Sequence, residues 1–362
     1  MKTFKAFLIF SLFSLLFVSQ VSAQAPTVKM EFEKGNVVSS STKSTNESLE
    51  VHITQGSDKG RTIKLNYDTQ GLQNNNISNG DGLVISKVTQ NGKILYAVND
   101  ENRLPFVGIF IALFLALIVL VAGKKGVGSI IGLGISLGVI FFFIVPAILS
   151  GQNPLNICVL GAIIIILPTT YIAHGISIKT TIALISTLTA LFLTWIIATF
   201  ALQLTHLSGF GSEEAYDLHI GLKSLVDFRG LLLGGIIIAT IGALNDITTT
   251  QSATIFELHH TDPKFDFDDL LKKGMSVGRE HAVSLVNTLV LAFIGSSLAL
   301  FILYFYNPTK EPLWAILNSE IISEEIIRTI VGTSGLLLSM PIVTILATFY
   351  CAHYSREYKN KS

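Results

Sequence analysis

The sequence GLLLGGIIIATIGALNDITTTQ, residues 230–251, is almost entirely apolar through Leu244 and polar from Asn245 onward. As a helix it is long enough to cross the hydrocarbon core of a bilayer, about 30 Å thick. Six other apolar segments have similar lengths, and the seven cover residues 105–123, 127–149, 155–173, 180–203, 230–251, 282–305 and 329–351. This pattern predicts an α-helical polytopic membrane protein with about seven spans.

The bulk composition agrees with a membrane protein. Half of the 362 residues are hydrophobic and only 14% are charged, with a mean hydropathy of +0.58, whereas soluble domains carry about 25% charge. The formal net charge is zero, which gives no reason to expect nucleic acid as a partner. Cys158 and Cys351 both lie in apolar segments and are expected to pack in the core rather than form a disulfide or bind metal.

The N-terminal segment is typical of a secretory signal peptide. Lys2 and Lys5 precede an apolar run over residues 6–18, and Val21, Ser22 and Ala23 supply small residues for cleavage after Ala23. We therefore expect residues 1–23 to be removed. An uncleaved first helix stays open as the alternative.

Residues 24–103 form a polar, turn-rich region. Five short segments alternate or are β-branched, which predicts strands near residues 28–32, 49–53, 61–65, 82–88 and 93–98. We expect a small extracytoplasmic β-barrel-like domain of the OB or SH3-like kind, with a mobile loop at residues 38–47. Tyr67 and Tyr96 are its only tyrosines, which favours a scaffold or interaction domain over an oligosaccharide-binding one.

Charge gives the orientation of the helical domain, residues 104–352, and of the tail, residues 353–362. With the β domain outside, ten Lys or Arg residues fall on predicted cytoplasmic segments and four on external ones. This bias follows the positive-inside rule. We expect a multi-pass protein of the bacterial cytoplasmic (inner) membrane with its C terminus in the cytoplasm.

Several local patterns predict finer features. Glycines 128, 132, 134 and 138, and later Gly230 and Gly234, form small-xxx-small pairs that favour close helix packing. A short cytoplasmic helix is predicted over residues 266–275, with Asp266 as its N-cap and Gly274 near its end. Residues 314–328 are expected to form an amphipathic helix at the outer interface. Pro341 is expected to interrupt the last span and widen a cavity there.

A polar cluster on the fifth and sixth spans is the candidate functional site. It comprises Asn245, Asp246, Thr248, Thr250, Gln251, Arg279, Glu280, His281, Asn287 and Thr288. An Asp at the centre of a membrane helix costs about 2.5–3.5 kcal/mol to insert, so it ordinarily faces a partner or a water-filled cavity. We expect Asp246 and Arg279 to meet at similar depth. In the alternative, the fifth span ends at Leu244, Asp246 caps a cytoplasmic helix, and the remaining polar residues only join helices.

These segments resemble the YibE/F-like family of multi-pass bacterial membrane proteins. The resemblance rests on Gly242–Thr248, Gly278–His281, Val286–Leu289 with Gly295, and Gly332–Gly335 followed by Pro341. Glu280 stands where the family is expected to have Asp, and Asn245 where it often has an apolar residue. The resemblance implies the multi-pass architecture, and it implies a permease only as a hypothesis.

Two functions follow as hypotheses. The first is a permease or transporter for a small solute or ion, in which Asp246 binds a proton or cation and pairs with Arg279. The alternative is a membrane scaffold or envelope assembly factor whose β domain binds an envelope protein. Because no nucleophile-elbow, HExxH or P-loop motif occurs in the sequence, we expect neither an enzyme nor a cofactor. The lipid bilayer is the one partner expected in either case, and the sequence indicates no oligomeric state.

Overall fold

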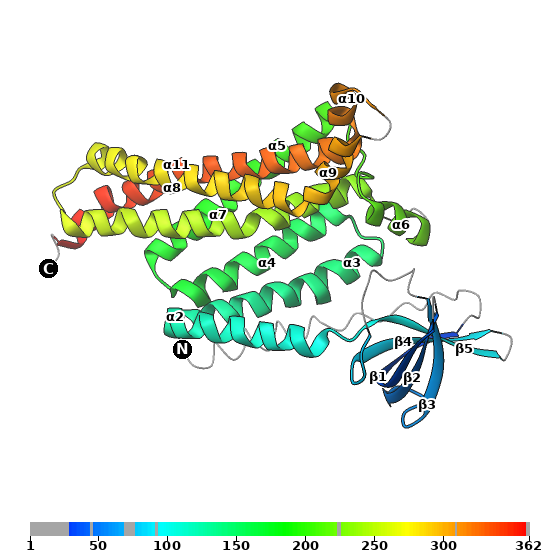
Figure 1. Ribbon diagram of the computed structural model, residues 1–362. Coiled ribbons are helices and arrows are strands. Elements are labelled where there is room, and N and C mark those ends of the chain that lie inside the picture. The colour runs from blue at the N-terminus through cyan, green and yellow to red at the C-terminus, as the bar shows by residue number, and fades with distance from the viewer. Residues whose placement is uncertain are drawn as a thin grey trace. The chain divides into compact units, whose positions relative to one another are not determined.

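The protein is described by a computed structural model that covers residues 29–43, 46–68, 77–90, 93–222, 226–307 and 310–359. The predicted signal peptide lies outside these residues. The chain divides into two units, one extending to Leu120 and the other beginning at Val121. Figure 1 shows a curled antiparallel sheet in the first unit and a bundle of long helices in the second.

The sheet contains five strands in the order β3-β2-β1-β4-β5. Their bounds are β1 Lys29–Lys43, β2 Asn46–Gln55, β3 Thr62–Asp68, β4 Gly82–Gln90 and β5 Lys93–Glu101. All five predicted strands are confirmed, because each lies at or within one residue of an observed strand. Alternate residues such as Leu49, Val51, Leu83 and Ile85 are fully buried and form the core of this sheet. The assignment to an OB or SH3-like barrel stays a prediction.

The prediction of a loop at residues 38–47 is wrong, as far as the structure describes this stretch. Residues 38–43 continue β1 and pair with the start of β2, with Ser39 opposite Glu50 and Lys43 opposite Asn46. Strand pairing uses main-chain groups, so serine and threonine side chains on this segment do not prevent it. Polar composition alone misled the prediction.

Helices account for the rest of the described chain. The long ones are α2 Leu104–Val139, α4 Pro154–His174, α5 Ile178–Thr205, α7 Phe228–Thr261, α8 Phe267–Ser296 and α11 Glu320–Lys359. The short ones are α3 Val145–Leu149, α6 Glu213–Leu222, α9 Leu298–Tyr306 and α10 Leu313–Asn318. A π-helical turn, η1 Ile140–Ile144, joins α2 to α3, so the helical stretch runs over Leu104–Leu149. Six helices are long and apolar enough to cross a membrane, among the residues that the structure describes.

The first of these six contains a break. Gly123 has φ 56° and ψ −132°, a conformation outside the helical region that glycine adopts readily. Two segments counted separately in the sequence, residues 105–123 and 127–149, therefore lie on either side of one glycine. A second break, at Ser297, divides the sixth predicted segment between α8 and α9.

Three helices, α5, α7 and α11, pack against one another and form the centre of the bundle. Helix α4 packs on α7, and α8 packs on α11 and α7 (Figure 1). Glycines allow these close approaches: Gly234 on α7 faces Cys158 on α4, and Gly335 on α11 faces Thr194 on α5, with no space for a Cβ atom. The expected close packing at Gly234 is thus confirmed.

Two predicted helix interruptions are wrong. The helix that begins after Asp266, whose side chain accepts a hydrogen bond from Asp269 N at 2.8 Å, continues through Gly274 to Ser296. Gly274 serves packing instead, because a Cβ atom there would collide with Ile255. Helix α11 likewise runs through Pro341 without a break. The expected amphipathic helix at residues 314–328 is divided between α10 and the first turns of α11.

Candidate functional site

The position of Asp246 along α7 can be measured from a contact with α5. Ser252 Oγ donates a hydrogen bond of 2.8 Å to the carbonyl of Lys179, in the first turn of α5. Asp246 precedes Ser252 by six residues, which is about 9 Å along a helix. Asp246 therefore lies about 9 Å along α7 from the level of Lys179, on a helix that packs against α4 and α5.

Because α7 is continuous from Phe228 to Thr261, Asp246 does not cap a separate helix. The level at which the membrane span ends stays a prediction. Asp246 is exposed on α7, and so is Thr250 one turn later. Gly235, Ala239 and Gly242 occupy the same exposed face, and their small side chains leave space along the helix. This exposed face of α7 extends from Gly235, near the apolar end of the helix, to Asp246.

One titratable group, His174, lies within electrostatic range of this carboxylate. His174 lies at the end of α4, where Lys125 and Lys179 also act on it. No ion pair joins Asp246 to Arg279 within the described residues. The reason is geometric. Successive helical residues point about 100° apart, and it is the neighbouring residues, Ile247 and Gly278, that face the interhelical contacts.

The remaining polar residues of α7 are held by other helices. Thr248 and Thr187 of α5 share a hydrogen bond of 2.6 Å, and Asn245 Oδ1 accepts one of 2.8 Å from Thr170 of α4. Gln251 Nε2 donates to the carbonyl of Gly274 and to Thr344 Oγ1 of α11, both at 2.8 Å. These three side chains fix the packing of α7 against four neighbours.

Sequence reasoning missed the partners of these residues. Thr170, Thr187 and Thr344 are buried, yet all three lie in largely apolar spans that contain other Ser and Thr residues. A threonine in a membrane helix commonly bonds its own main chain, as Thr187 does with the carbonyl of Ala183. Only contact between helices distinguishes those that also reach across.

Most of the predicted site residues of α8 lie on the face of that helix that points away from the bundle, and so away from α7. Gly278 and Ala282 face the bundle, while Arg279, Glu280, Asn287 and Thr288 are exposed. His281 lies at the edge, and its Nε2 atom is buried without a hydrogen-bond partner within the described residues. The predicted cluster therefore divides into a packed set on α7, an exposed face of α7 at Asp246, and an exposed stripe on α8.

A pair of carboxylates, Glu320 and Glu324, lies in the first turns of α11. Glu320 Oε1 accepts hydrogen bonds from the main-chain amides of Ser208, at 2.7 Å, and Gly209. The buried Glu324 accepts one of 3.0 Å from the amide of Gly211. These bonds fasten the loop after α5 to the start of α11. Neither glutamate was predicted from the sequence, because their partners are main-chain groups 111–113 residues away.

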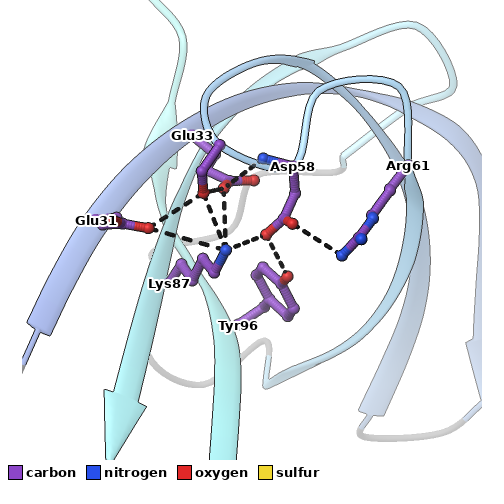
Figure 2. A network of polar contacts seen from close by, with 7 residues as sticks. Glu31, Glu33, Asp58, Arg61, Lys87 and Tyr96 are labelled. Atoms are coloured by element: carbon purple, nitrogen blue, oxygen red, sulfur yellow. Dashed lines mark hydrogen bonds and ion pairs between the residues drawn. The ribbon is translucent and has the colours of Figure 1, made fainter.

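The β domain contains its own buried ionic network, shown in Figure 2. Lys87 Nζ of β4 bonds Asp58 Oδ2, which also accepts a 2.6 Å hydrogen bond from Tyr96 Oη. Glu33 Oε1 accepts from Ser57 Oγ at 2.8 Å and from the amide of Asp58 at 3.2 Å. The network attaches the loop between β2 and β3 to the neighbouring strands.

The charges in this network shift each other's titration. The hydrogen bonds from Lys87 and Tyr96 lower the pKa of Asp58 to about 2. The hydrogen bond to Asp58 raises the pKa of Lys87. Both shifts favour the charged forms, so the network is an ion pair across the ordinary pH range.

Comparison with known proteins gives one match. The model of the YibE/F-like protein family matches residues 110–353. No curated protein matches the chain, and no solved structure matches it.

Proposed function

This chain belongs to the YibE/F-like protein family, and we propose that it is a permease for a small solute or ion. Its family and its six long apolar helices make it an integral membrane protein. In the proposal, the helical stretch Leu104–Leu149 supplies two spans separated at Gly123, because 46 helical residues would extend about 69 Å, twice the hydrocarbon thickness. That gives seven spans, with the β domain outside and the C terminus in the cytoplasm.

The observation that carries the proposal is the exposed carboxylate of Asp246. It lies about 9 Å inside the level of Lys179, the cation that precedes the apolar run of α5. An ionisable group at this depth is unfavourable in lipid and ordinarily faces water or a partner. The small residues Gly235, Ala239 and Gly242 on the same face leave space beside it.

The chemistry of the site fits a cation or a proton. A carboxylate with no ion-pair partner in the described chain binds a cation directly or takes up a proton when its surroundings become less polar. His174 on α4 offers a second titratable group within electrostatic range. In the proposed mechanism Asp246 exchanges its proton or cation with the cytoplasm, and Thr250 supplies a neutral oxygen one turn nearer that side. Since the sequence has no nucleotide-binding motif, an ion gradient or a separate subunit would supply the energy.

Cysteine accessibility in membranes tests this pathway. Single cysteines at Gly242, Asp246 and Thr250, in a background without Cys158 and Cys351, would be probed with a small charged thiol reagent from either side. The proposal expects labelling at all three, and none at the buried control position Thr248. If Gly242 and Asp246 stay unlabelled from both sides while Thr250 reacts from the cytoplasm, no aqueous pathway reaches the carboxylate and the permease proposal fails.

A second function, that of a scaffold, is supported by an apolar patch on the β domain. Met30 on β1, Val88 on β4 and Leu95 on β5 are neighbours across the sheet. Met30, Leu95 and the adjacent Phe32 are exposed by 51%, 61% and 59%. An apolar patch of this kind on a water-facing sheet commonly marks a protein contact. If the scaffold function holds, Phe32→Ser with Leu95→Ser abolishes function in cells while Asp246→Asn does not.

A further inference from the structure

One face of α8 is exposed and has the spacing of a helix–helix contact, and only at its far end does a residue, Ile294, line a pocket with Ile326 and Ile330 of α11. Six exposed residues follow one another at alternating intervals of three and four: Val277, Glu280, Ser284, Asn287, Leu291 and Ile294. We call this set the α8 seam. Gly278, Ala282, Leu285 and Leu289, on the opposite side of the helix, pack against α7 and α11. Intervals of three and four keep the six residues along one side of the helix, as the contact between two paired helices requires.

The seam is unsuited to lipid at its centre. Gly278 contacts Gln251, the neighbour of Ser252, which bonds the start of α5. Asn287 is nine residues further along α8, about 14 Å deeper, and therefore near the middle of the hydrocarbon core. There its amide has no water to bond, and an unbonded amide in an apolar medium is strongly unfavourable. Ser284, one turn away, adds a hydroxyl on the same face.

We propose that the α8 seam binds the α8 seam of a second copy of this chain, as a parallel pair about a twofold axis normal to the membrane. Two copies inserted in the same orientation present identical residues at identical depth. The seam is chemically self-complementary under that symmetry. The Asn287 amide has both donors and an acceptor, so two of them bond each other, and the Ser284 hydroxyls do the same.

The ends of the seam fit the same arrangement. Leu291 and Ile294, exposed by 69% and 42%, meet their own copies as apolar pairs. Glu280 lies near the level of Gln251, where water and headgroups begin, and Arg279 beside it supplies the opposite charge to the partner's Glu280. In coiled coils one buried Asn fixes the register and the number of helices, and Asn287 would have that role in this pair. The seam does not include Asp246, so the proposed dimer can be correct or wrong independently of the proposed permease function.

Oxidative cross-linking in native membranes tests the pair. In the background without Cys158 and Cys351, Ser284→Cys and Leu291→Cys are expected to form disulfide-linked dimers with copper phenanthroline. Ile185→Cys, on α5 and exposed by 50%, is the matched control and is expected to stay monomeric. Equal cross-linking at Ile185 would mean random collision and would overturn the proposal.

Two other results would also overturn it. Cross-linking of Leu291→Cys only to a different protein would assign the seam to another partner. Labelling of Ser284→Cys and Asn287→Cys by a water-soluble reagent, with no cross-link, would assign it to an aqueous pathway. As a second measurement, Asn287→Leu is expected to weaken dimerisation in detergent by about 3- to 30-fold, the range for one interhelical polar contact. If Asn287→Leu dimerises as well as wild type and no cross-links form, the seam does not mediate dimerisation and the proposal is wrong.

Discussion

Gln251 Nε2 lies 2.8 Å from Thr344 Oγ1 and the same distance from the carbonyl of Gly274, so one side chain joins α7 to α11 and α8. Gln251 is 2% exposed. Its amide therefore replaces water as the partner of two buried oxygen atoms. Gln251 therefore has a structural role, joining three helices. Asp246, five residues earlier on the same helix, is exposed and does not take part in this junction.

Replacing Gln251 with leucine should destabilise the bundle. The change leaves the Gly274 carbonyl and the Thr344 hydroxyl without this donor, at a cost of about 1–3 kcal/mol. Thermal unfolding in detergent, followed by the loss of the monodisperse chromatographic peak, should show a lower midpoint. Thr250→Val on the exposed face of the same helix is the control, and equal midpoints for the two variants would contradict the junction.

Replacing Asp246 with asparagine should stop transport without harming the fold. Neutralising an exposed carboxylate at membrane depth removes an unfavourable charge, so the amount of inserted protein and its unfolding midpoint should not fall. Proton flux in proteoliposomes, measured with entrapped pyranine, and Na⁺ flux, measured with a sodium dye, compare the variant with wild type. A variant that is less stable but carries equal flux would make Asp246 a structural residue.

Two glycines of α2 should respond oppositely to alanine, although they share the same sequence pattern. A Cβ atom at Gly128 would lie 2.9 Å from the main-chain oxygen of Ile172 on α4, whereas one at Gly134 would meet nothing within 4 Å. Gly128→Ala should lower the stability by about 1–3 kcal/mol, because a backbone must shift. Gly134→Ala should leave the unfolding midpoint unchanged or raise it, and a matching loss in both variants would refute the close contact with α4.

The β domain should keep its ionic network over a wide pH range. Asp58 has a pKa of about 2 in the folded protein against an ordinary value of 3.8, so its contribution is complete above pH 3.8 and disappears as the pH falls through 2. Lys87 has a raised pKa in the folded protein, so its contribution is complete below its ordinary value and lost at still higher pH.

Hydrogen exchange on the full-length protein measures this contribution. At pH 7, Asp58→Asn should accelerate exchange in the loop over residues 56–60, because Lys87 loses its closest anion. Lys64→Gln removes an exposed ion pair with Glu50 and should leave the loop unchanged. Equal protection in wild type and Asp58→Asn would show that the network does not hold the loop.

Much of the architecture was predictable because it depends on local patterns. The apolar runs lie within the observed helices, and the alternating segments became the five strands. The Asp266 N-cap was also predictable, since a cap is formed by a side chain and an amide three residues apart. Two of the predictions that turned out wrong assigned one fixed meaning to a residue type. Gly274 and Pro341 were expected to end or break helices, and the helices pass through both.

The candidate site was predictable only in part. The sequence indicated which residues of α7 and α8 are unusual at membrane depth, but not which way each points. A difference of one residue turns a helical side chain by about 100°, enough to place Ile247 in the core and Asp246 outside it.

The sequence by itself determined the membrane class, the β domain and the apolar helices, because each depends on the length or period of a short segment and on transfer from water. Tertiary structure alone decided that Gln251 and Thr248 pack while Asp246 and Asn287 stay exposed, and that Glu33, Asp58 and Lys87 form one network. Those outcomes depend on contacts between residues that lie from 23 to 93 positions apart. Composition and local spacing do not specify contacts between residues so far apart in the sequence, because these contacts form only when the helices and strands pack together.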